Sequence, residues 1–539
     1  MTSITKKLTY KIGEKSFKIY HKDYECFELN IGCAVNSVVC DDVDEEGYLL
    51  SQEKLGDKEV FTWTGRSNIW EKKEYILEIY KDNFLFRVKI YGEGTLGKVD
   101  YFSRSSYEFS RYFIPNPLGG ALTLPQYHSP EQDGTVAMQY STPPLLGFSF
   151  EFENGWLSMG IAPQPGNYNF EKFDYEYARS GCFALSTDFM GYTKVNGEFE
   201  LPGIMGGFGS DEYDALASYA DGLYEFCGYK RKSWSDSPRW WYGPLFCGWS
   251  EQAAMNPENQ FDAANQKNYE DMSRRLDEFG LKPTAIIIDD KWQTSYGESL
   301  PDPEKWPDLR GFTDREHEKG RKIVLWFKSW NHEGLDADEC VRWYSLPQGA
   351  DPTSPLYIKR VEDTLYKLLS SEDGCYNCDG FKIDFANVMP HGKNLKSYGN
   401  VYGIELLKEL MKLIYNTAKS IKPDCLINNS CSHPYFAEVT DQCRLHDYAG
   451  TQRSAWTVMS YRYRLYQAAM PGVLIDTDTV RSNYRETLDY INRCGELGAP
   501  DLYFLSNNAK VNFDDQILDA LKVSWGKYSD QLDGGEIYE

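Results

Sequence analysis

The sequence has few basic residues and very few histidines for its length. Lys and Arg together number 57 against 81 Asp and Glu, which gives a formal net charge of −24, and only seven His occur in 539 residues. A negative field of this size repels polyanions, so we expect neither a nucleic acid nor an acidic membrane surface as a partner. A neutral small-molecule or oligosaccharide substrate fits the charge better.

Long apolar runs are also missing. The longest, such as Thr284–Ile288, are far shorter than a membrane span. The first residues alternate polar and apolar side chains, so no signal peptide is expected. The 13 cysteines follow no spacing framework and are interpreted as reduced thiols of a cytoplasmic protein. Cys375 and Cys378 form a lone CxxC without a second ligand pair, which favours buried thiols over a zinc or redox site.

No glycine-rich fingerprint follows any expected strand, so we expect no dinucleotide or phosphate-binding loop and no cofactor. Aromatic residues, by contrast, are abundant at 15% of the chain. Large β-sheets favour aromatic side chains, and sugar-binding sites use flat rings to stack on pyranose faces. Composition alone leaves these two explanations equal.

Two kinds of periodicity divide the chain, which is long enough for more than one domain. Within residues 1–235, polar and apolar side chains alternate with a period of two, as in Tyr75–Lys81 and Asn83–Tyr91. Phe148–Gly160 contains an Asn-Gly turn between two such runs, which indicates a hairpin. A helical stretch, Asp211–Tyr229, ends this part. We therefore predict an antiparallel β-sandwich domain over 1–235, with a linking helix at its end.

Residues 236–539 have a different pattern, in which short apolar runs alternate with amphipathic stretches. This pattern predicts a catalytic (β/α)8 barrel, with a doubly wound open sheet as the alternative. The eight strand candidates are Leu245–Trp249, Ala285–Asp289, Ile323–Phe327, Phe381–Phe385, Cys425–Asn429, Gln442–His446, Val473–Asp476 and Asp501–Leu505. The expected helices include Asn268–Phe279, Tyr357–Ser370, Tyr402–Ser420, Trp456–Met470, Tyr484–Leu497 and Phe513–Tyr528.

Carboxylates follow four of these strands, at the end where barrel enzymes place their active sites. They are Asp289 with Asp290, Asp384, Asp447, and Asp476 with Asp478. Any single Asp in this position is more simply explained as the cap of the next helix. The combination is more specific, because carboxylates from separate strands meet at one end of a barrel.

Lys382 and Asp384 lie two apart on one strand, so their side chains share a face. The ammonium would keep Asp384 ionised, which suits a nucleophile, while Asp447 on another strand would stay protonated and act as the acid. Such a pair is the minimum needed to hydrolyse a glycosidic bond. No metal is predicted, because only His433 and His446 lie near these aspartates and a lysine beside Asp384 disfavours a divalent cation.

The motifs of the barrel half resemble glycoside hydrolase clan D, and most of all family 36, the α-galactosidase and raffinose-synthase group. Gly380–Phe385 resembles the nucleophile strand of that family, and Ile288–Gln293 resembles its paired-Asp substrate motif, with Lys291 where a small residue is usual. Further segments resemble the family in the same order, and these are Gly248–Ser250, Trp326, Cys431–Pro434 and Asp476–Asp478.

The resemblance implies a role for each matching residue. Asp384 would be the nucleophile that forms a covalent glycosyl intermediate, and Asp447 the general acid and then base. Asp289 and Asp290 would accept hydrogen bonds from sugar hydroxyls, with the axial O4 and O6 as targets. The remaining expected substrate-binding residues are Lys382, Arg444, Trp249, Trp326 and Cys431.

The resemblance thus implies a retaining hydrolase of terminal α-galactosides. Three alternatives stay open: a transglycosylase similar to raffinose synthases, an α-glucosidase or α-N-acetylgalactosaminidase, and a non-catalytic sugar-binding protein. A homo-oligomer is also left open.

Two features depart from the family pattern. Arg444 and Asp447 are three positions apart, whereas four are usual in the family, so Asp441 is an alternative acid/base. A bulge at the end of the strand could restore the usual placement of the Asp447 carboxyl group. Only an acidic tail follows the helix expected at Phe513–Tyr528, so we expect the closing C-terminal β-domain of such enzymes to be absent.

Overall fold

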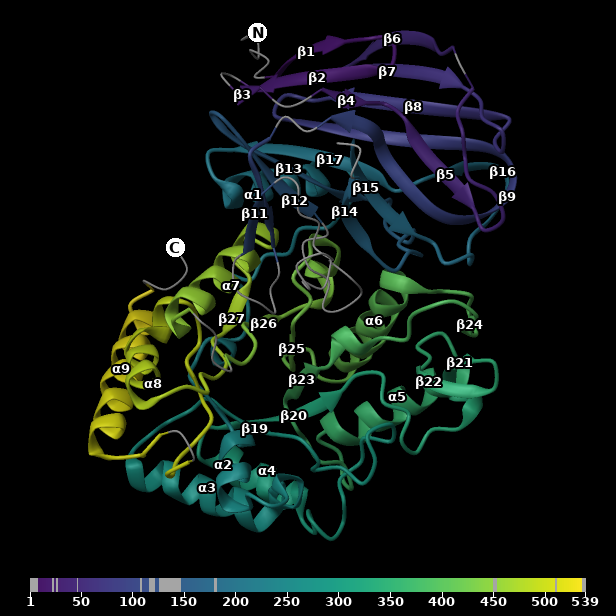
Figure 1. Ribbon diagram of the computed structural model, residues 1–539. Coiled ribbons are helices and arrows are strands. Elements are labelled where there is room, and N and C mark those ends of the chain that lie inside the picture. Colours follow the sequence, from purple (N-terminus) through teal and green to yellow (C-terminus); the bar gives the residue numbers. More distant parts are fainter. Residues whose placement is uncertain are drawn as a thin grey trace.

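The computed structural model describes residues 8–535 except 22–23, 26–27, 46, 107–108, 116–121, 126–146, 179–181, 449–452 and 509–510, so the last four residues of the acidic tail lie outside it. An antiparallel β-domain lies above a barrel of parallel strands and helices (Figure 1). The predicted fold class, a β-sandwich followed by a (β/α)8 barrel, is confirmed.

The β-domain has two sheets around an aromatic core. The four-stranded sheet contains β1 (Leu8–Ile12), β2 (Ser16–His21), β3 (Tyr24–Glu25) and β4 (Leu29–Asn30). The 13-stranded sheet contains β5 (Cys33–Ser37), β6 (Leu49–Leu55), β7 (Lys58–Gly65), β8 (Lys72–Ile79), β9 (Asn83–Ser106), β10 (Arg111–Ile114), β11 (Leu122–Pro125), β12 (Gly147–Phe152), β13 (Gly155–Ala162), β14 (Phe173–Ala178), β15 (Cys182–Asp188), β16 (Lys194–Glu200) and β17 (Gly203–Gly209). Phe17 of β2 joins the two sheets, because its ring lies 6.0 Å from Phe84 and 5.9 Å from Phe86 of β9.

Helix α1 (Glu212–Phe226) lies against β13 and β17. Asp211 caps it, because its side chain accepts hydrogen bonds from the backbone N–H groups of Tyr213 and Asp214. A Cβ atom on Gly209 of β17 would come within 2.1 Å of the backbone nitrogen of Ala215. The glycines of β17 therefore permit the close approach of the helix.

The barrel strands are all parallel and pair in the order β27-β26-β25-β23-β20-β19-β18-β28. A bridge between Asp476 of β27 and Ala499, which precedes β28, closes the ring and excludes the open sheet. The strands are β18 (Leu245–Cys247), β19 (Ala285–Ile288), β20 (Lys322–Lys328), β23 (Gly380–Asp384), β25 (Leu426–Asn429), β26 (Gln442–Arg444), β27 (Leu474–Asp476) and β28 (Asp501–Leu502).

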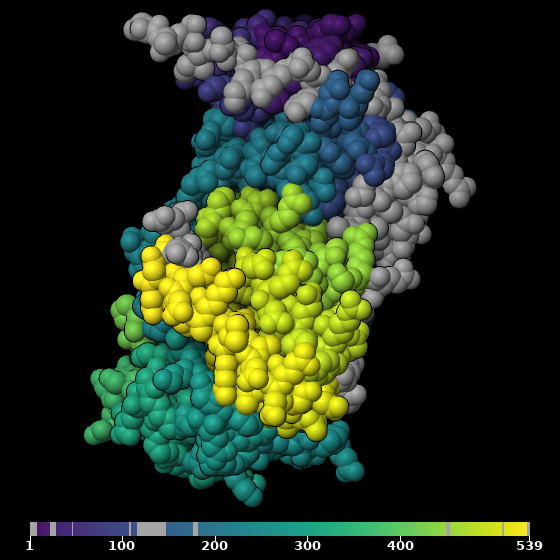
Figure 2. Space-filling view, turned by 90° about the vertical axis from the view of Figure 1, so that its left-hand side faces the viewer, coloured from purple at the N-terminus to yellow at the C-terminus, as the bar shows by residue number. Residues whose placement is uncertain are grey.

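Helices surround these strands on the outside (Figure 1). They are α2 (Trp249–Met255), α3 (Gln266–Phe279), α4 (Leu309–Glu318), α5 (Pro355–Leu369), α6 (Gly403–Ile421), α7 (Ala455–Ala469), α8 (Tyr484–Arg493) and α9 (Asp515–Asp533). A small sheet of β21 (Cys340–Trp343), β22 (Leu346–Ala350) and β24 (Leu395–Lys396) extends from loops of the barrel. Figure 2 shows the C-terminal helices, in yellow, on the surface of the barrel below the β-domain.

The two parts of the molecule meet through hydrogen bonds between buried polar groups. The Tyr435 hydroxyl donates to Glu405 of α6 and accepts the backbone N–H of Gly166, which follows β13. His433 lies in the same seam, where its Nε2 is 3.3 Å from the Tyr219 hydroxyl of α1. The division between the domains at residue 235 stays a prediction. None of the described helices combines the length and apolar composition needed to cross a membrane.

Candidate active site

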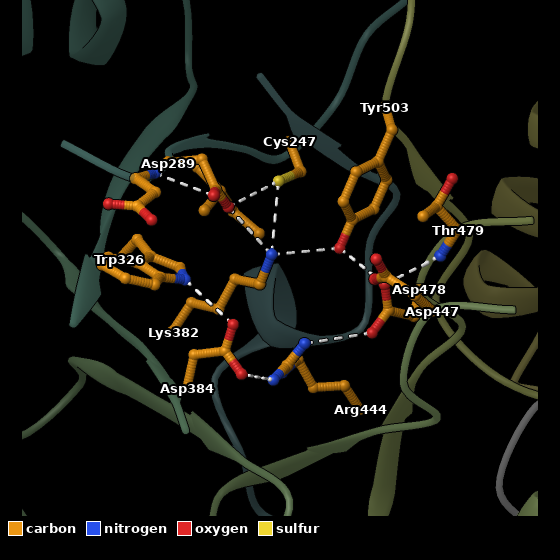
Figure 3. Close-up of polar contacts among 12 residues, drawn as sticks. Cys247, Asp289, Trp326, Lys382, Asp384, Arg444, Asp447, Asp478, Thr479 and Tyr503 are labelled. Atoms are coloured by element: carbon orange, nitrogen blue, oxygen red, sulfur yellow. Dashed lines mark hydrogen bonds and ion pairs between the residues drawn. The ribbon is translucent and has the colours of Figure 1, made fainter. Parts of the chain in front are cut away.

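Polar side chains from several barrel strands converge at the carboxyl end of the barrel (Figure 3). Alternation along each strand places every second side chain inside the ring. The converging residues are Cys247 of β18, Asp289 after β19, Trp326 of β20, Lys382 and Asp384 of β23, Arg444 of β26, Asp478 after β27 and Tyr503 after β28. The sequence-predicted aspartates, lysine and arginine are thus brought together.

Asp384 is held by three donors. Arg444 Nη2 donates to its Oδ1 at 2.5 Å and the backbone N–H of Phe385 donates to the same oxygen at 2.8 Å. Trp326 Nε1 donates to Oδ2 at 3.1 Å. Burial alone would raise the pKa of Asp384, but Arg444 and then Lys382 hold it well below its usual range. This carboxylate is ionised at neutral pH and remains 28% exposed.

Arg444 divides its guanidinium between two aspartates. Its Nη1 donates to Asp478 Oδ2 at 3.2 Å, and Asp478 Oδ1 accepts the Tyr503 hydroxyl at 2.7 Å. Burial opposes ionisation of Asp478, yet Arg444 and Lys382 lower its pKa. The arginine side chain is 3% exposed and that of Asp478 is fully buried, so the ion pair between them is shielded from water.

Lys382 does not bond to Asp384, although the two share a strand face. Its Nζ donates to Asp289 Oδ2 at 2.9 Å, to the Tyr503 hydroxyl at 3.1 Å and to Cys247 Sγ at 3.4 Å. Burial would lower the pKa of Lys382, but Asp289 raises it well above the ordinary value. Lys382 therefore acts on Asp384 through space, and Arg444 is the direct partner of that carboxylate.

Asp290 differs from its neighbour in having a free oxygen. Among the described residues its Oδ1 accepts the Tyr296 hydroxyl at 2.8 Å, and no donor is recorded for Oδ2. Burial, opposed by Tyr296 and reinforced by the adjacent Asp289, raises the pKa of Asp290 to about 6. Asp289, in contrast, has both oxygens occupied, because Oδ1 accepts the backbone N–H of Asp290 at 2.8 Å.

Asp447 lies beyond the end of β26 and pairs with Arg481, whose Nη2 donates to its Oδ2. The Asp447 side chain is 30% exposed. The alternative residue, Asp441, precedes β26 and so lies at the opposite, amino end of the barrel. There it is fully buried between Lys232 Nζ at 2.8 Å and Lys419 Nζ at 2.6 Å. This position leaves Asp447 as the acid/base candidate.

The other expected binding residues have different environments. Trp326 is buried at the site, and Phe385 and Tyr296 pack edge-on at 6.2 and 5.9 Å from its ring. Trp249 lies half-buried at the start of α2, at the rim of the barrel. Cys431 is fully buried, and its backbone N–H donates to the Asn429 side chain. A thiol so enclosed contributes to packing of the loop after β25.

Non-glycine residues with left-handed backbone follow five of the barrel strands. Each occurs within a few residues of the carboxyl end, where the chain turns sharply, and they are Lys291 (φ 74°), Trp330 (φ 66°), Phe385 (φ 57°), His446 (φ 64°) and Asp478 (φ 52°). This conformation is unfavourable for residues with a Cβ atom and persists only where the surroundings enforce it. Strain therefore accumulates at the end of the barrel that carries the polar cluster.

Sequence reasoning missed four residues of the site. Tyr503, Tyr296 and Arg481 contact predicted residues, and the Nζ of Lys328 lies 4.1 Å from the centre of the Tyr296 ring and 5.1 Å from that of Phe385. The alternation that selected Asp384 would also have found Lys328, which ends β20 two positions after Trp326. No comparable signal marks Tyr296 or Arg481, which lie in loops.

The cluster can perform acid–base and nucleophilic chemistry on a polar ligand. Asp384 is a partly exposed, ionised carboxylate, and Asp447 is a second carboxylate that follows β26, the next strand but one in the barrel. No group of three or more His, Cys, Asp or Glu suited to a metal ion occurs among residues 8–535 that the structure describes.

The fold combines an N-terminal antiparallel β-domain with a (β/α)8 barrel. No protein-family model matches the sequence, and no curated protein is similar to it. An α-galactosidase from Lactobacillus brevis has a similar structure, with a TM-score of 0.55 and 11% identity over 98% of this chain and 84% of that chain.

A variant of a family 36 α-galactosidase from Geobacillus stearothermophilus, in complex with 1-deoxygalactonojirimycin, matches with a TM-score of 0.58 and 11% identity over 97% of this chain and 78% of that chain. A glycoside hydrolase family 97 enzyme from Pseudoalteromonas sp. strain K8, in complex with panose, matches with a TM-score of 0.51 and 12% identity over 87% and 73% of the two chains. At these identities the similarity shows a shared fold, and it assigns neither a family nor an activity.

Proposed function

We propose that the protein is a retaining glycoside hydrolase that cleaves terminal α-galactosides or closely related α-glycosides. The observation that supports this most is the state of Asp384, a carboxylate held ionised by Arg444 at the carboxyl end of a barrel. The motif resemblance points to the same residue as a nucleophile. Two of the structural neighbours are α-galactosidases, which supports the choice of sugar.

In the first step, Asp384 attacks the anomeric carbon through Oδ2, because Oδ1 is committed to Arg444 and Phe385. The bond between this carbon and the leaving oxygen breaks as Asp447 delivers its proton to that oxygen. In the second step, Asp447 as a carboxylate takes a proton from water. The water oxygen attacks the anomeric carbon and releases Asp384, so the configuration is retained.

The remaining residues bind and orient the sugar. Asp290 has an oxygen available for a sugar hydroxyl, and the Tyr296 hydroxyl fixes its orientation. Trp326 provides an apolar wall and a hydrogen bond to the nucleophile. Asp289 and Lys382 form a buried ion pair, so their charges neutralise each other beneath the sugar.

The test replaces Asp384 with Gly. We expect initial rates on 4-nitrophenyl α-galactoside to fall by about 10³–10⁶-fold, and added azide to restore turnover as the β-galactosyl azide. The control is Asp424→Asn, an exposed aspartate at the amino end of β25, which should leave the rate unchanged. An undiminished rate in Asp384→Gly, or failure of the native protein to cleave any of a panel of nitrophenyl α-glycosides, would refute the proposal. Free galactose as the product, rather than a longer oligosaccharide, would separate hydrolysis from transfer.

A further inference from the structure

A cavity lies beside the polar cluster, at the same end of the barrel. Its volume is about 350 Å³, which falls within the range of small-ligand pockets. Its walls come from the segments that follow β18, β27 and β28. The cavity adjoins the polar cluster at two points of the chain. Asp478 belongs to the cluster and the next residue, Thr479, lines the cavity; Tyr503 and Phe504 are arranged in the same way.

The lining suits a neutral, hydroxyl-rich ring. Trp249 and Phe504 supply aromatic surface, and Gln260 and Asn507 supply side-chain amides. Among the described residues that line it, none is Asp or Glu, and Arg481 carries the positive charge. Flat rings combined with amides are the surfaces that stack on sugars and bond to their hydroxyls.

Arg481 links this cavity to Asp447, because it lines the cavity and its guanidinium pairs with the Asp447 carboxylate. Its backbone is fixed by the neighbouring loop: Arg481 N–H donates to the Tyr448 carbonyl at 2.7 Å, and Tyr448 N–H donates to the Thr479 carbonyl at 2.9 Å. The guanidinium, with the side chain 41% exposed, can therefore change partner while the two loops stay joined.

Among the described residues, Arg462 and Arg444 have partners other than the Asp447 carboxylate. Arg462 Nη1 donates to the backbone oxygens of Leu445, His446 and Asp447 at 2.9, 2.7 and 3.3 Å. Arg444 is shared between Asp384 and Asp478. Burial, with Arg444 and Arg462, lowers the pKa of His446 to about 3, so that ring is neutral at working pH.

An acid catalyst must carry a proton, whereas an ion pair with arginine stabilises the charged carboxylate. The ion pair with Arg481 therefore favours the form of Asp447 that the second step of hydrolysis needs, and it opposes the form that the first step needs. We propose that the cavity binds the sugar of the leaving group and that Arg481 couples its occupancy to the proton on Asp447. This inference rests on the proposed function.

The coupling follows from an exchange of partners. A sugar in the cavity offers hydroxyl oxygens to the Arg481 guanidinium, which leaves Asp447, and Asp447 takes a proton from solvent. That proton passes to the glycosidic oxygen as its bond to the anomeric carbon breaks and the bond from Asp384 forms. Arg481 is a positioning residue that delays acid catalysis until a leaving-group sugar is present.

The test compares three substrates with the same α-galactosyl group. A disaccharide fills the cavity, a methyl α-glycoside leaves it empty but still needs the acid, and a 4-nitrophenyl α-glycoside departs without a proton. We measure kcat/KM as a function of pH for the native protein, Arg481→Met and Arg481→Lys. For each protein, the values on the disaccharide and the methyl glycoside are divided by its value on the 4-nitrophenyl glycoside. Arg464→Met is the matched control, since it removes an exposed ion pair between Arg464 of α7 and Asp211, neither of which lines the cavity.

In Arg481→Met we expect the preference for the disaccharide over the methyl glycoside to fall by about ten-fold, and the basic limb of the methyl-glycoside profile to move to higher pH by about one unit. Arg481→Lys should keep both native features. Ala254→Phe, which narrows the cavity from α2, should lower the disaccharide rate relative to the methyl glycoside without moving that limb.

The proposal is overturned if Arg481→Met keeps both the native preference for the disaccharide over the methyl glycoside and the native basic limb. If Arg481→Met does not fold, an unchanged preference for the disaccharide in Ala254→Phe overturns it instead. If the native protein cleaves none of the three substrates, the proposed function itself fails. This result differs from the two outcomes that overturn only the role of Arg481 and the cavity.

Discussion

At the scale of single residues, Asp290 has a pKa of about 6, within the pH range in which glycosidases work. Burial raises this pKa, while Tyr296 and the ammonium of Lys328 lower it. In the proposed role of Asp290 as an acceptor of sugar hydroxyls, the ionised carboxylate binds more strongly than the neutral acid, so substrate affinity should weaken when the pH falls below its pKa.

We predict that KM for an α-galactoside rises severalfold as the pH falls from 7 to 5, and that Lys328→Met moves this rise to higher pH. Removal of the ammonium leaves the charged carboxylate less stabilised, which is why the shift is upward. Steady-state kinetics between pH 4.5 and 8 provide the measurement. Lys328→Arg, which keeps the charge, is the matched control, and a KM that stays flat across this range would contradict the role given to Asp290.

At the scale of elements, the contact between β27 and β28 closes the barrel and contains two buried carboxyl groups. Burial and then Asp478 raise the pKa of Asp476 to about 6, and burial and then Asp476 raise that of Asp501 well above its usual value. A carboxyl group whose pKa is raised by folding stabilises the fold fully below its unfolded pKa, near 4. That contribution is lost as the pH rises through the folded value.

Asp501→Asn should therefore stabilise the protein at pH 8, where burying the acid costs most, and change little at pH 4. The amide keeps the shape of the side chain without a charge, and a gain of about 1–2 kcal/mol is expected at the higher pH. Thermal unfolding of both proteins at the two pH values measures the difference. Equal or lower stability of Asp501→Asn at pH 8 would show that Asp501 is ionised and paired in the folded state.

The sequence predicted the elements of the barrel well, because each strand is a short apolar run that ends in a polar residue. All eight expected strands are present, as are the six expected helices. Helix α4 was missed, since Leu309–Glu318 contains a glycine and few apolar residues. Helix α2 was missed because it begins within two residues of the end of β18, inside the run assigned to the strand.

The positions of the candidate site residues followed from the same pattern, but their partners did not. Strand ends of a barrel meet, which was enough to group Asp289, Lys382 and Asp384. Which cation contacts which carboxylate depends on side-chain reach across the ring: Lys382 extends to Asp289, and Arg444 to Asp384. The role of Arg481 depends on a loop, and period-two alternation carries no information about loops.

At the scale of the whole molecule, the β-domain contacts the loop that follows β23. Glu171, which precedes β14, accepts the backbone N–H of Gly392 with both oxygens, at 2.8 and 2.9 Å. Tyr192 of the same domain accepts the backbone N–H of Leu395 at 2.8 Å. The loop after β23 is thus held by two side chains of the neighbouring domain, and the geometry beyond Asp384 depends on both domains.

Glu171 should make this contact between the domains sensitive to pH. Burial raises the pKa of Glu171 to about 7, against an opposing effect of the Gly392 N–H. The sign follows from the raised value: the contribution to stability is complete below the unfolded pKa, near 4.3, and is lost as the pH rises through 7. The corresponding change is up to about 3 kcal/mol between pH 5 and pH 8.

We therefore expect the midpoint of thermal unfolding to fall by several degrees from pH 5.5 to pH 8.5 in the native protein, and by clearly less in Glu171→Gln, whose amide does not titrate. Glu53→Gln, an exposed position of β6 in the same domain, should follow the native profile. Parallel profiles for Glu171→Gln and the native protein would mean that Glu171 is ionised throughout. In that case the hold of the β-domain on the loop after β23 would be independent of pH, and the two domains would respond to acid and base as separate units.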